Sequence, residues 1–240
     1  MPMVEELERT GNWLFRWRSY LPLLLVGMIV ASVNHFGYPL HSHFLDELWE
    51  VLCLMVGLFG LTIRALTVGF VPRNTSGRNT VHQVAETLNT SGMYSIVRNP
   101  LYLGNFFMGL AVALFVRMWW VPLIYTLTFA LYYERIIFAE EMFLRRQFGD
   151  VYITWSSKTP AFIPRLSRWR KPELGFSLRT VLRREYQSLY ALIIALFVLE
   201  QGLELYLGHG FHIDAMWVWI TTISTCFYII VRVLHLKTKC

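Results

Sequence analysis

The chain alternates long apolar runs with shorter polar segments. Five or six apolar runs of roughly 16 to 22 residues make up nearly half of its 240 residues. A helix needs about 20 apolar residues to cross a hydrocarbon core. We therefore expect an all-α fold, a polytopic transmembrane helical bundle with about six spans. The predicted spans are Leu21 to Gly37, Leu48 to Val71, Leu101 to Val116, Trp119 to Tyr133, Leu189 to Leu207 and Met216 to Val233.

The third and fourth spans predict a short central helix hairpin. Only Arg117 and Met118 separate them, so the two helices must pack side by side in opposite directions. The fourth helix is expected to continue past the membrane through Gln147. It should end near Gly149, since glycine commonly terminates helices.

Composition and charge place these helices in a membrane. Hydrophobic residues make up 55% of the chain, and the mean hydropathy is +0.42. Both values exceed those of soluble domains of this size. Nearly all Lys and Arg residues fall on one set of loops, and Arg117 alone lies on the other set, which predicts that both termini are cytoplasmic. The net charge of +6 is thus a topology signal beside lipid headgroups, and we expect no nucleic-acid partner.

The segment from Arg98 to Asn105 predicts a ligand site where the third span begins. Pro100 suits the first turn of a helix and biases Asn99 toward an extended backbone, which leaves free backbone N–H groups at that end. A helix N-terminus with Arg98 beside it attracts a carboxylate or a phosphate. Gly104, one turn further on, would let a ligand approach the backbone closely.

Two adjacent carboxylates, Glu140 and Glu141, lie where the fourth helix leaves the membrane. Antiparallel packing of the hairpin should bring them toward Arg98 and Tyr102. Neighbouring residues on a helix point about 100° apart, so one carboxylate can face a pocket while the other takes a structural partner. A surface ion pair would explain either Glu alone, but the combination with the Arg98 segment favours a site.

These positions resemble the C-terminal signature of the isoprenylcysteine carboxyl methyltransferase and phospholipid methyltransferase superfamily. The similarity covers roughly Gly92 to Pro164, about a third of the chain. It implies an S-adenosylmethionine-dependent membrane methyltransferase whose cofactor binds from the cytosol and whose lipid substrate enters from the bilayer. The matching residues are Gly92, Tyr94, Arg98, Pro100, Tyr102, Gly104, Glu140, Glu141, Phe148, Gly149 and Tyr152.

The resemblance also implies roles for individual residues. Arg98 and Glu141 are the expected catalytic residues. The expected cofactor-binding residues are Tyr94, Asn99, Pro100, Tyr102, Gly104, Asn105, Glu140 and Glu141. Asn99 departs from the family pattern, which usually has His there. This exchange removes the residue of the segment that titrates near neutral pH, although Asn can still donate and accept hydrogen bonds.

That departure favours a substrate that is already an anion. An amine must lose a proton before methylation, whereas a carboxylate or a phosphate monoester, with a second pKa near 6, is ionised at pH 7. The candidate substrate-binding residues are Arg64 inside the second span, Arg73, Arg78 and Arg98. Arg64 is open to a second interpretation, in which its long side chain reaches the interface without binding a ligand.

Three segments follow from this interpretation. Residues 1–78 hold an N-terminal cytoplasmic part and two spans, residues 79–166 the catalytic core, and residues 167–240 a basic loop and a C-terminal hairpin. Within the core, Thr80 to Leu88 carries a capping box and one apolar face, which predicts a short interfacial helix acting as a spacer or as a gate.

We expect the protein to methylate an oxygen, phosphate or carboxylate, of an anionic lipid such as a lipid A phosphate in a bacterial inner membrane, with no metal. Within the same class, the alternatives are N-methylation of phosphatidylethanolamine and carboxyl methylation of a prenylated cysteine. Outside it, membrane sterol reductases share a similar Arg-x-Pro-x-Tyr segment and use NADPH. A non-enzymatic scaffold would leave the Arg98 and Glu141 segments without a purpose.

Overall fold

The computed structural model describes residues 2–32, 43–72, 85–206, 208 and 214–237, and its ordered elements are helices joined by loops. This confirms the predicted all-α fold. The helices are α1 (Met3–Trp17), α2 (Leu21–Ser32), α3 (His43–Gly69), α4 (Met93–Ile96), α5 (Pro100–Phe115), α6 (Trp120–Phe148), α7 (Asp150–Ser156), α8 (Leu178–Tyr206) and α9 (Ala215–Lys237), with the 3-10 turns η1 (Arg18–Tyr20) and η4 (Leu166–Arg168).

Four of the described helices, α3, α6, α8 and α9, are long and apolar enough to cross a membrane, and α5 is a shorter apolar helix. Each predicted span falls on a helix. Both α6 and α8 extend beyond the apolar run that predicted them, because that run marks the membrane part of a longer helix. The first predicted span matches α2 as far as Ser32, and residues 33–37 of that prediction lie outside the described residues.

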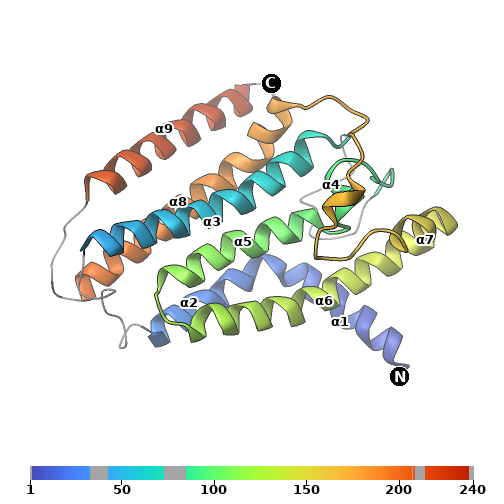
Figure 1. Cartoon of the computed structure of the whole chain (residues 1–240), viewed down its shortest axis with the longest axis horizontal. Helices are drawn as coiled ribbons and strands as arrows, with labels where there is room; N and C mark the ends of the chain where they lie inside the picture. Colours follow the sequence, from blue (N-terminus) through green and yellow to red (C-terminus); the bar gives the residue numbers. More distant parts are fainter. Residues whose placement is uncertain (1, 33–42, 73–84, 207, 209–213, 238–240) are drawn as a thin grey trace.

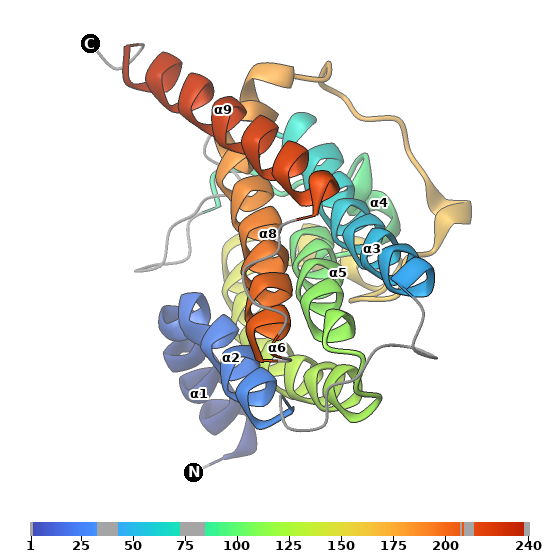
Figure 2. The same ribbon diagram turned by 90° about the vertical axis from the view of Figure 1, so that its left-hand side faces the viewer.

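The long helices run roughly along one axis and alternate in direction (Figure 1). Helix α5 lies in the middle, with α3, α6 and α8 around it (Figure 2). It supplies buried side chains to three apolar clusters. Tyr102 packs with α1, α2 and α6, Phe115 with α3, α8 and α9, and Leu103 with α3 and α4. The short hairpin helix is therefore the centre of the bundle.

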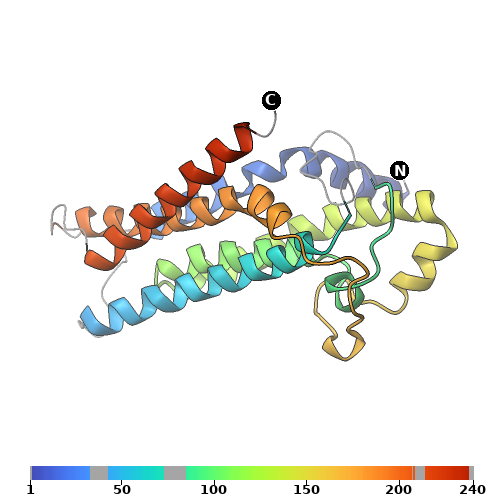
Figure 3. The ribbon, with the colours of Figure 1, turned by 90° about the horizontal axis from the view of Figure 1, so that it is seen from above.

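The two ends of the bundle differ. At one end, α4, the start of α5, α7 and the loop through η4 lie together (Figure 3). We call this the motif end, since it carries Arg98, Glu140 and Glu141. At the other end, Arg117 joins α5 to α6 and the described chain of α3 begins. We call this the hairpin end.

Glycine ends α6 as predicted. Gly149 has φ +53°, a backbone conformation that favours glycine, and its N–H donates to the Arg145 carbonyl at 3.0 Å. The chain then turns into α7, which folds away from the axis of α6 (Figure 3). This turn brings Tyr152 back toward the charged residues of α6.

Backbone hydrogen bonds fix the loops of the motif end. The Arg98 N–H donates to the Pro160 carbonyl at 2.8 Å, and the Arg165 N–H donates to the Ile96 carbonyl at 2.9 Å. The Gly92 N–H donates to the Arg170 carbonyl at 3.0 Å. The segment around α4 is thus attached at three places to the chain that follows α7.

The predicted helix from Thr80 to Leu88 is wrong in the part that can be compared. Residues 80–84 lie outside the described residues, and residues 85–88 are irregular, with a bend at 86–87 instead of a helix. The carbonyl of Ala85 accepts a hydrogen bond from the Gln147 side chain of α6. A contact with a distant helix replaces the local bond that a helix would have made.

Candidate active site

The central observation at the motif end is the pairing of Arg98 with Glu141. The Arg98 Nη1 atom lies 3.3 Å from the Glu141 Oε2 atom. Arg98 precedes α5, and Glu141 lies on the extension of α6, so the pair joins the two arms of the central hairpin. This confirms the predicted convergence of the two segments.

Tyr152 completes this charged cluster from α7. Its side chain is buried, and its hydroxyl interacts electrostatically with Glu141 and Arg98. Within the described part of the chain, Arg98 Nε, Glu141 Oε1 and the Tyr152 hydroxyl are buried without a well-formed hydrogen bond. Buried polar atoms normally have partners, so these three mark a place where a ligand can bind.

Glu140 faces a different set of groups. The Tyr102 hydroxyl donates a hydrogen bond to the Glu140 Oε1 atom at 2.7 Å. The Arg18 Nη1 atom lies 3.9 Å from the same oxygen. The two adjacent carboxylates therefore take separate partners, as expected for neighbouring positions on a helix.

Tyr94 on α4 lies beside this region. The Trp155 indole N–H donates to its backbone carbonyl at 3.1 Å, which ties α4 to α7. Burial raises the pKa of Tyr94 above its ordinary value, and the charge of Glu140 raises it further. Burial and the charge of Glu141 likewise raise the pKa of Tyr152. Both phenols are therefore protonated at neutral pH and can donate hydrogen bonds.

Asn99 and Pro100 shape the start of α5. Pro100 occupies the first turn as predicted, and Asn99 is the N-cap residue, although its side chain does not cap the helix. Its Nδ2 atom donates to the Ala161 carbonyl at 3.0 Å instead. Asn99 thereby attaches the helix start to the loop after α7, and its predicted cofactor role stays a prediction.

Gly104 has a packing role that the sequence analysis did not foresee. A Cβ atom there would lie 2.5 Å from the Arg64 Cγ atom and 2.7 Å from the Gly60 carbonyl oxygen on α3. The expected open space for a ligand directly over Gly104 is therefore wrong, because α3 fills it. Small residues of this kind let membrane helices approach closely.

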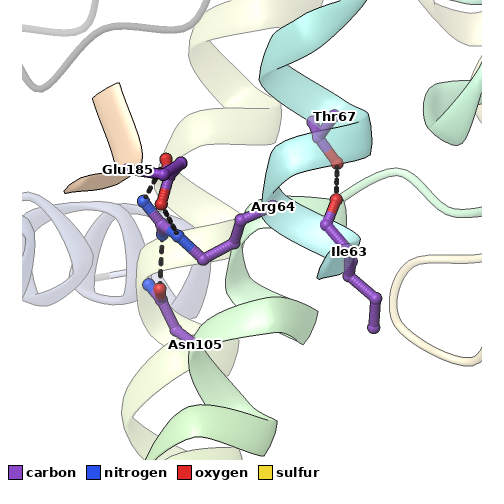
Figure 4. A network of polar contacts seen from close by, with 5 residues as sticks. All are labelled: Ile63, Arg64, Thr67, Asn105 and Glu185. Atoms are coloured by element: carbon purple, nitrogen blue, oxygen red, sulfur yellow. Dashed lines mark hydrogen bonds and ion pairs between the residues drawn. The ribbon is translucent and has the colours of Figure 1, made fainter. Parts of the chain in front are cut away.

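Arg64 holds two helices to α3 (Figure 4). Its Nε and Nη2 atoms pair with both carboxylate oxygens of Glu185 on α8, at 2.8 and 2.9 Å. Its Nη1 atom donates to Asn105 Oδ1 on α5 at 2.5 Å. A bidentate pair of this type is strong and geometrically specific. The headgroup role of Arg64 stays a prediction, and Arg73 and Arg78 lie outside the described residues.

Two charged residues of this region were missed by sequence reasoning. Arg18 counted only as one of the basic residues that predict the topology, with no role at the site. Glu185 precedes the apolar run that predicted α8, so it looked like part of a loop. The Arg64 to Glu185 pair spans 121 positions, and no local pattern predicts such a contact.

A cavity of about 810 Å³ lies beside α7, and Arg98, Glu141 and Tyr152 are not part of its lining. Trp155 lines it and also contacts the Tyr152 ring, with 5.7 Å between ring centroids. Three cationic side chains, Lys158, Arg168 and Arg170, share its lining with one carboxylate, Asp150, and several hydroxyl groups. Its size suits a small ligand or a lipid headgroup, and its cations suit an anion.

Comparisons with known proteins identify the family. Residues 58–151 match the family model described as phospholipid methyltransferase. The cobalt-zinc-cadmium resistance protein CzcN of Cupriavidus metallidurans is 33% identical over 160 residues, which cover 66% of this chain and 69% of that protein. The chain belongs to the phospholipid methyltransferase family.

Two further relatives agree with this placement. The nickel-cobalt-cadmium resistance protein NccN of Alcaligenes xylosoxydans xylosoxydans is 30% identical over 154 residues, 64% of this chain and 65% of that protein. The protein-S-isoprenylcysteine O-methyltransferase of Schizosaccharomyces pombe is 30% identical over 95 residues, 37% of this chain and 40% of that enzyme. No solved structure matches the chain.

Membership in the phospholipid methyltransferase family supports a membrane methyltransferase. The matched residues 58–151 include α4, α5, α6 and the start of α7, and thus Arg98, Glu140 and Glu141. They exclude Arg18 and Glu185. Of the Arg98, Glu141 and Tyr152 cluster, the matched segment contains the first two, and Tyr152 lies one residue beyond it.

Proposed function

We propose that the protein transfers a methyl group from S-adenosylmethionine to an oxygen of an anionic membrane lipid. The observation that carries this proposal is the cluster of Arg98, Glu141 and Tyr152, which has buried atoms without a well-formed hydrogen bond. The Tyr152 ring contacts Trp155, which lines a cavity with three cationic side chains. Arg98 and Glu141 are the proposed catalytic residues.

The charged groups of the motif end match those of S-adenosylmethionine. That cofactor supplies a methyl group on a positively charged sulfur. Glu140 and Glu141 suit its ammonium and ribose hydroxyl groups, and Arg98 suits its carboxylate. The rings of Tyr94 and Tyr102 suit the positive sulfur, since aromatic faces attract cations. Holding reactants in place can lower a barrier by about 7 to 11 kcal/mol, so positioning is the main task of these residues.

An anionic acceptor agrees with the residues near the cavity. Asn99 donates a hydrogen bond to a backbone carbonyl, and its amide cannot act as an acid or a base at neutral pH. An ionised acceptor oxygen can be methylated without a base. Lys158, Arg168 and Arg170 supply positive charge where a phosphate or carboxylate headgroup would lie. A lipid A phosphate is the proposed example of such a substrate.

The names of two relatives add support for this acceptor. CzcN and NccN are named for resistance to cobalt, cadmium and zinc or nickel. Methylation of a phosphate or carboxylate removes one negative charge and weakens an oxygen ligand for divalent cations. We propose that such a change lowers metal binding at the membrane surface. The basic loops of the motif end would then face the cytoplasm of a bacterial inner membrane.

Purified protein incubated with methyl-labelled S-adenosylmethionine and a total lipid extract tests the proposal. The label should enter an anionic lipid, and a Glu141→Gln variant should leave it unlabelled. Label recovered on ethanolamine headgroups would instead support phospholipid N-methylation, as the family description suggests. Label on a prenylated peptide would support the activity named for the Schizosaccharomyces pombe relative. Incubation with NADPH and a sterol is the control for a reductase.

A further inference from the structure

A positively charged side chain from outside residues 58–151, the segment that matches the family model, lies close to Glu140. The Arg18 Nη1 atom lies 3.9 Å from Glu140 Oε1, the same oxygen that accepts the Tyr102 hydrogen bond. Arg18 belongs to η1 and precedes residues 58–151, the part that matches the family model. The site thus includes a group that the shared segment does not supply.

Helix α1 is fixed against α6 at several points. Glu8 pairs with Arg146 through both carboxylate oxygens, at 2.5 and 3.0 Å. Gly11 lies directly against the Arg135 carbonyl, where any side chain would collide. The Tyr132 hydroxyl donates to the Leu14 carbonyl at 2.9 Å. These contacts place the end of α1, and therefore Arg18, in one position relative to Glu140.

Arg18 itself is held close to the carboxylate. Its guanidinium lies over the ring of the buried Phe15, 4.0 Å from the centroid, and its side chain is 18% exposed. At 3.9 Å the contact with Glu140 is too long for a hydrogen bond, so Arg18 acts through its charge. Arg18 and the Tyr102 hydroxyl both contact the Oε1 atom of Glu140. The Oε2 atom is therefore the one that can accept a hydrogen bond from a ligand.

We propose that Arg18 is a positioning residue for Glu140. Burial raises the pKa of the Glu140 carboxyl to about 7, and the charge of Arg18 opposes that rise. Arg18 thereby favours the ionised carboxylate beside Tyr102, the form that binds the cationic and hydroxyl groups of the cofactor. This inference rests on the proposed function, because it assigns Glu140 to S-adenosylmethionine. The N-terminal helix is then part of the active site as well as of the membrane domain.

Calorimetric titration of the detergent-solubilised protein with S-adenosylhomocysteine tests the inference. Arg18→Gln should weaken binding about tenfold, and Arg18→Lys should restore it to within about threefold of the native chain. Arg16→Gln is the matched control, because Arg16 lies on α1 two residues before Arg18 and is exposed. In the methylation assay, Arg18→Gln should raise the KM for S-adenosylmethionine and leave kcat at saturation nearly unchanged.

Arg18→Met is a second neutral variant, which keeps an unbranched apolar stem over Phe15. It must weaken binding as Arg18→Gln does, at an unchanged melting temperature. Native binding by either neutral variant, equal weakening in Arg16→Gln, or no recovery in Arg18→Lys would overturn the inference. If the native chain itself does not bind S-adenosylhomocysteine, the proposed function fails and the inference falls with it.

Discussion

Each end of the bundle joins an arginine to carboxylates, but the two clusters differ in exposure. At the motif end, the side chains of Arg98 and Glu141 are 20% and 27% exposed. At the hairpin end, Arg117 pairs with Asp46 and lies 3.6 Å from Glu50, and these three side chains are 6%, 9% and 2% exposed. The charged side chains are partly exposed at the motif end and buried at the hairpin end.

The hairpin-end cluster has the character of a structural lock. The Trp217 indole N–H donates to Glu50 Oε2 at 2.9 Å, which connects α9 to α3. Glu200 on α8 adds a third carboxylate, and the three carboxylates lie within 4.8 Å of one another. Arg117, at φ +63°, brings the counter-charge into this group from the hairpin turn. Three helices, α3, α8 and α9, and the turn are thereby joined.

The largest expected effect is on stability, from Arg117→Met. Removing one partner of a buried ion pair leaves uncompensated charge and costs about 3 to 5 kcal/mol. We expect a marked drop in resistance to denaturant, with cofactor binding retained by the molecules that stay folded. Denaturant titration in detergent measures the loss, and Arg145→Gln on the exposed surface is the control. Native stability of Arg117→Met would show that the closed cluster is not a lock.

The next largest effect should be confined to ligand binding. Glu141→Gln removes a charge that faces Arg98, and hydrogen bonds to charged groups contribute about 1.5 to 3 kcal/mol, so cofactor affinity should fall about 10- to 100-fold. Stability should stay near native because the pair is partly exposed. Calorimetry with S-adenosylhomocysteine gives the affinity. A stability loss as large as that of Arg117→Met would erase the distinction between the two ends.

A third variant tests the packing between the two ends. Gly104→Ala places a Cβ against Arg64 and the Gly60 carbonyl, and overpacking of this kind costs about 1 to 3 kcal/mol. Gly27→Ala is the matched control, since a Cβ at Gly27 meets nothing within 4 Å. Melting temperatures compare the two. Equal behaviour of both variants would rule out close helix contact as the reason for Gly104.

The smallest effect is expected at the surface of the motif end. Glu8→Gln breaks the pair with Arg146, whose side chain is 57% exposed, and exposed pairs contribute about 0.2 to 1 kcal/mol. The same pairing lowers the pKa of Glu8, so its contribution is present at neutral pH and is lost as the pH falls through that lowered pKa. The melting temperature of Glu8→Gln should lie slightly below that of the native chain at neutral pH. The two melting temperatures should coincide at acidic pH.

Local signals predicted the parts of the fold that depend on neighbouring residues. The two residues between the apolar runs of the hairpin fixed its antiparallel packing, and this packing brings Arg98 to Glu141. Pro100 and Gly149 mark the start of α5 and the end of α6, because the backbone preference of each residue determines the conformation at its own position. The resemblance to the family independently indicated the same four residues, Arg98, Glu141, Pro100 and Gly149.

Contacts between distant positions were beyond sequence reasoning. Arg64 with Glu185 and Arg18 with Glu140 join charges whose pairing depends on how whole helices pack. Ala85, in a segment predicted to be helical, likewise contacts a distant element, since its carbonyl accepts a hydrogen bond from Gln147 on α6. Periodicity describes what a segment prefers alone, and these tertiary contacts override it.

The hydrogen bonds between the α4 region and residues 160–170 impose an order on biogenesis. Arg98 obtains its backbone partner only when Pro160 has left the ribosome, and Gly92 only when Arg170 has done so. The central hairpin can enter the bilayer before that moment. Assembly of the motif end is therefore completed only after residues 160–170 have been made, and a chain that ends at Ser157 would lack the backbone partners of Arg98 and Gly92.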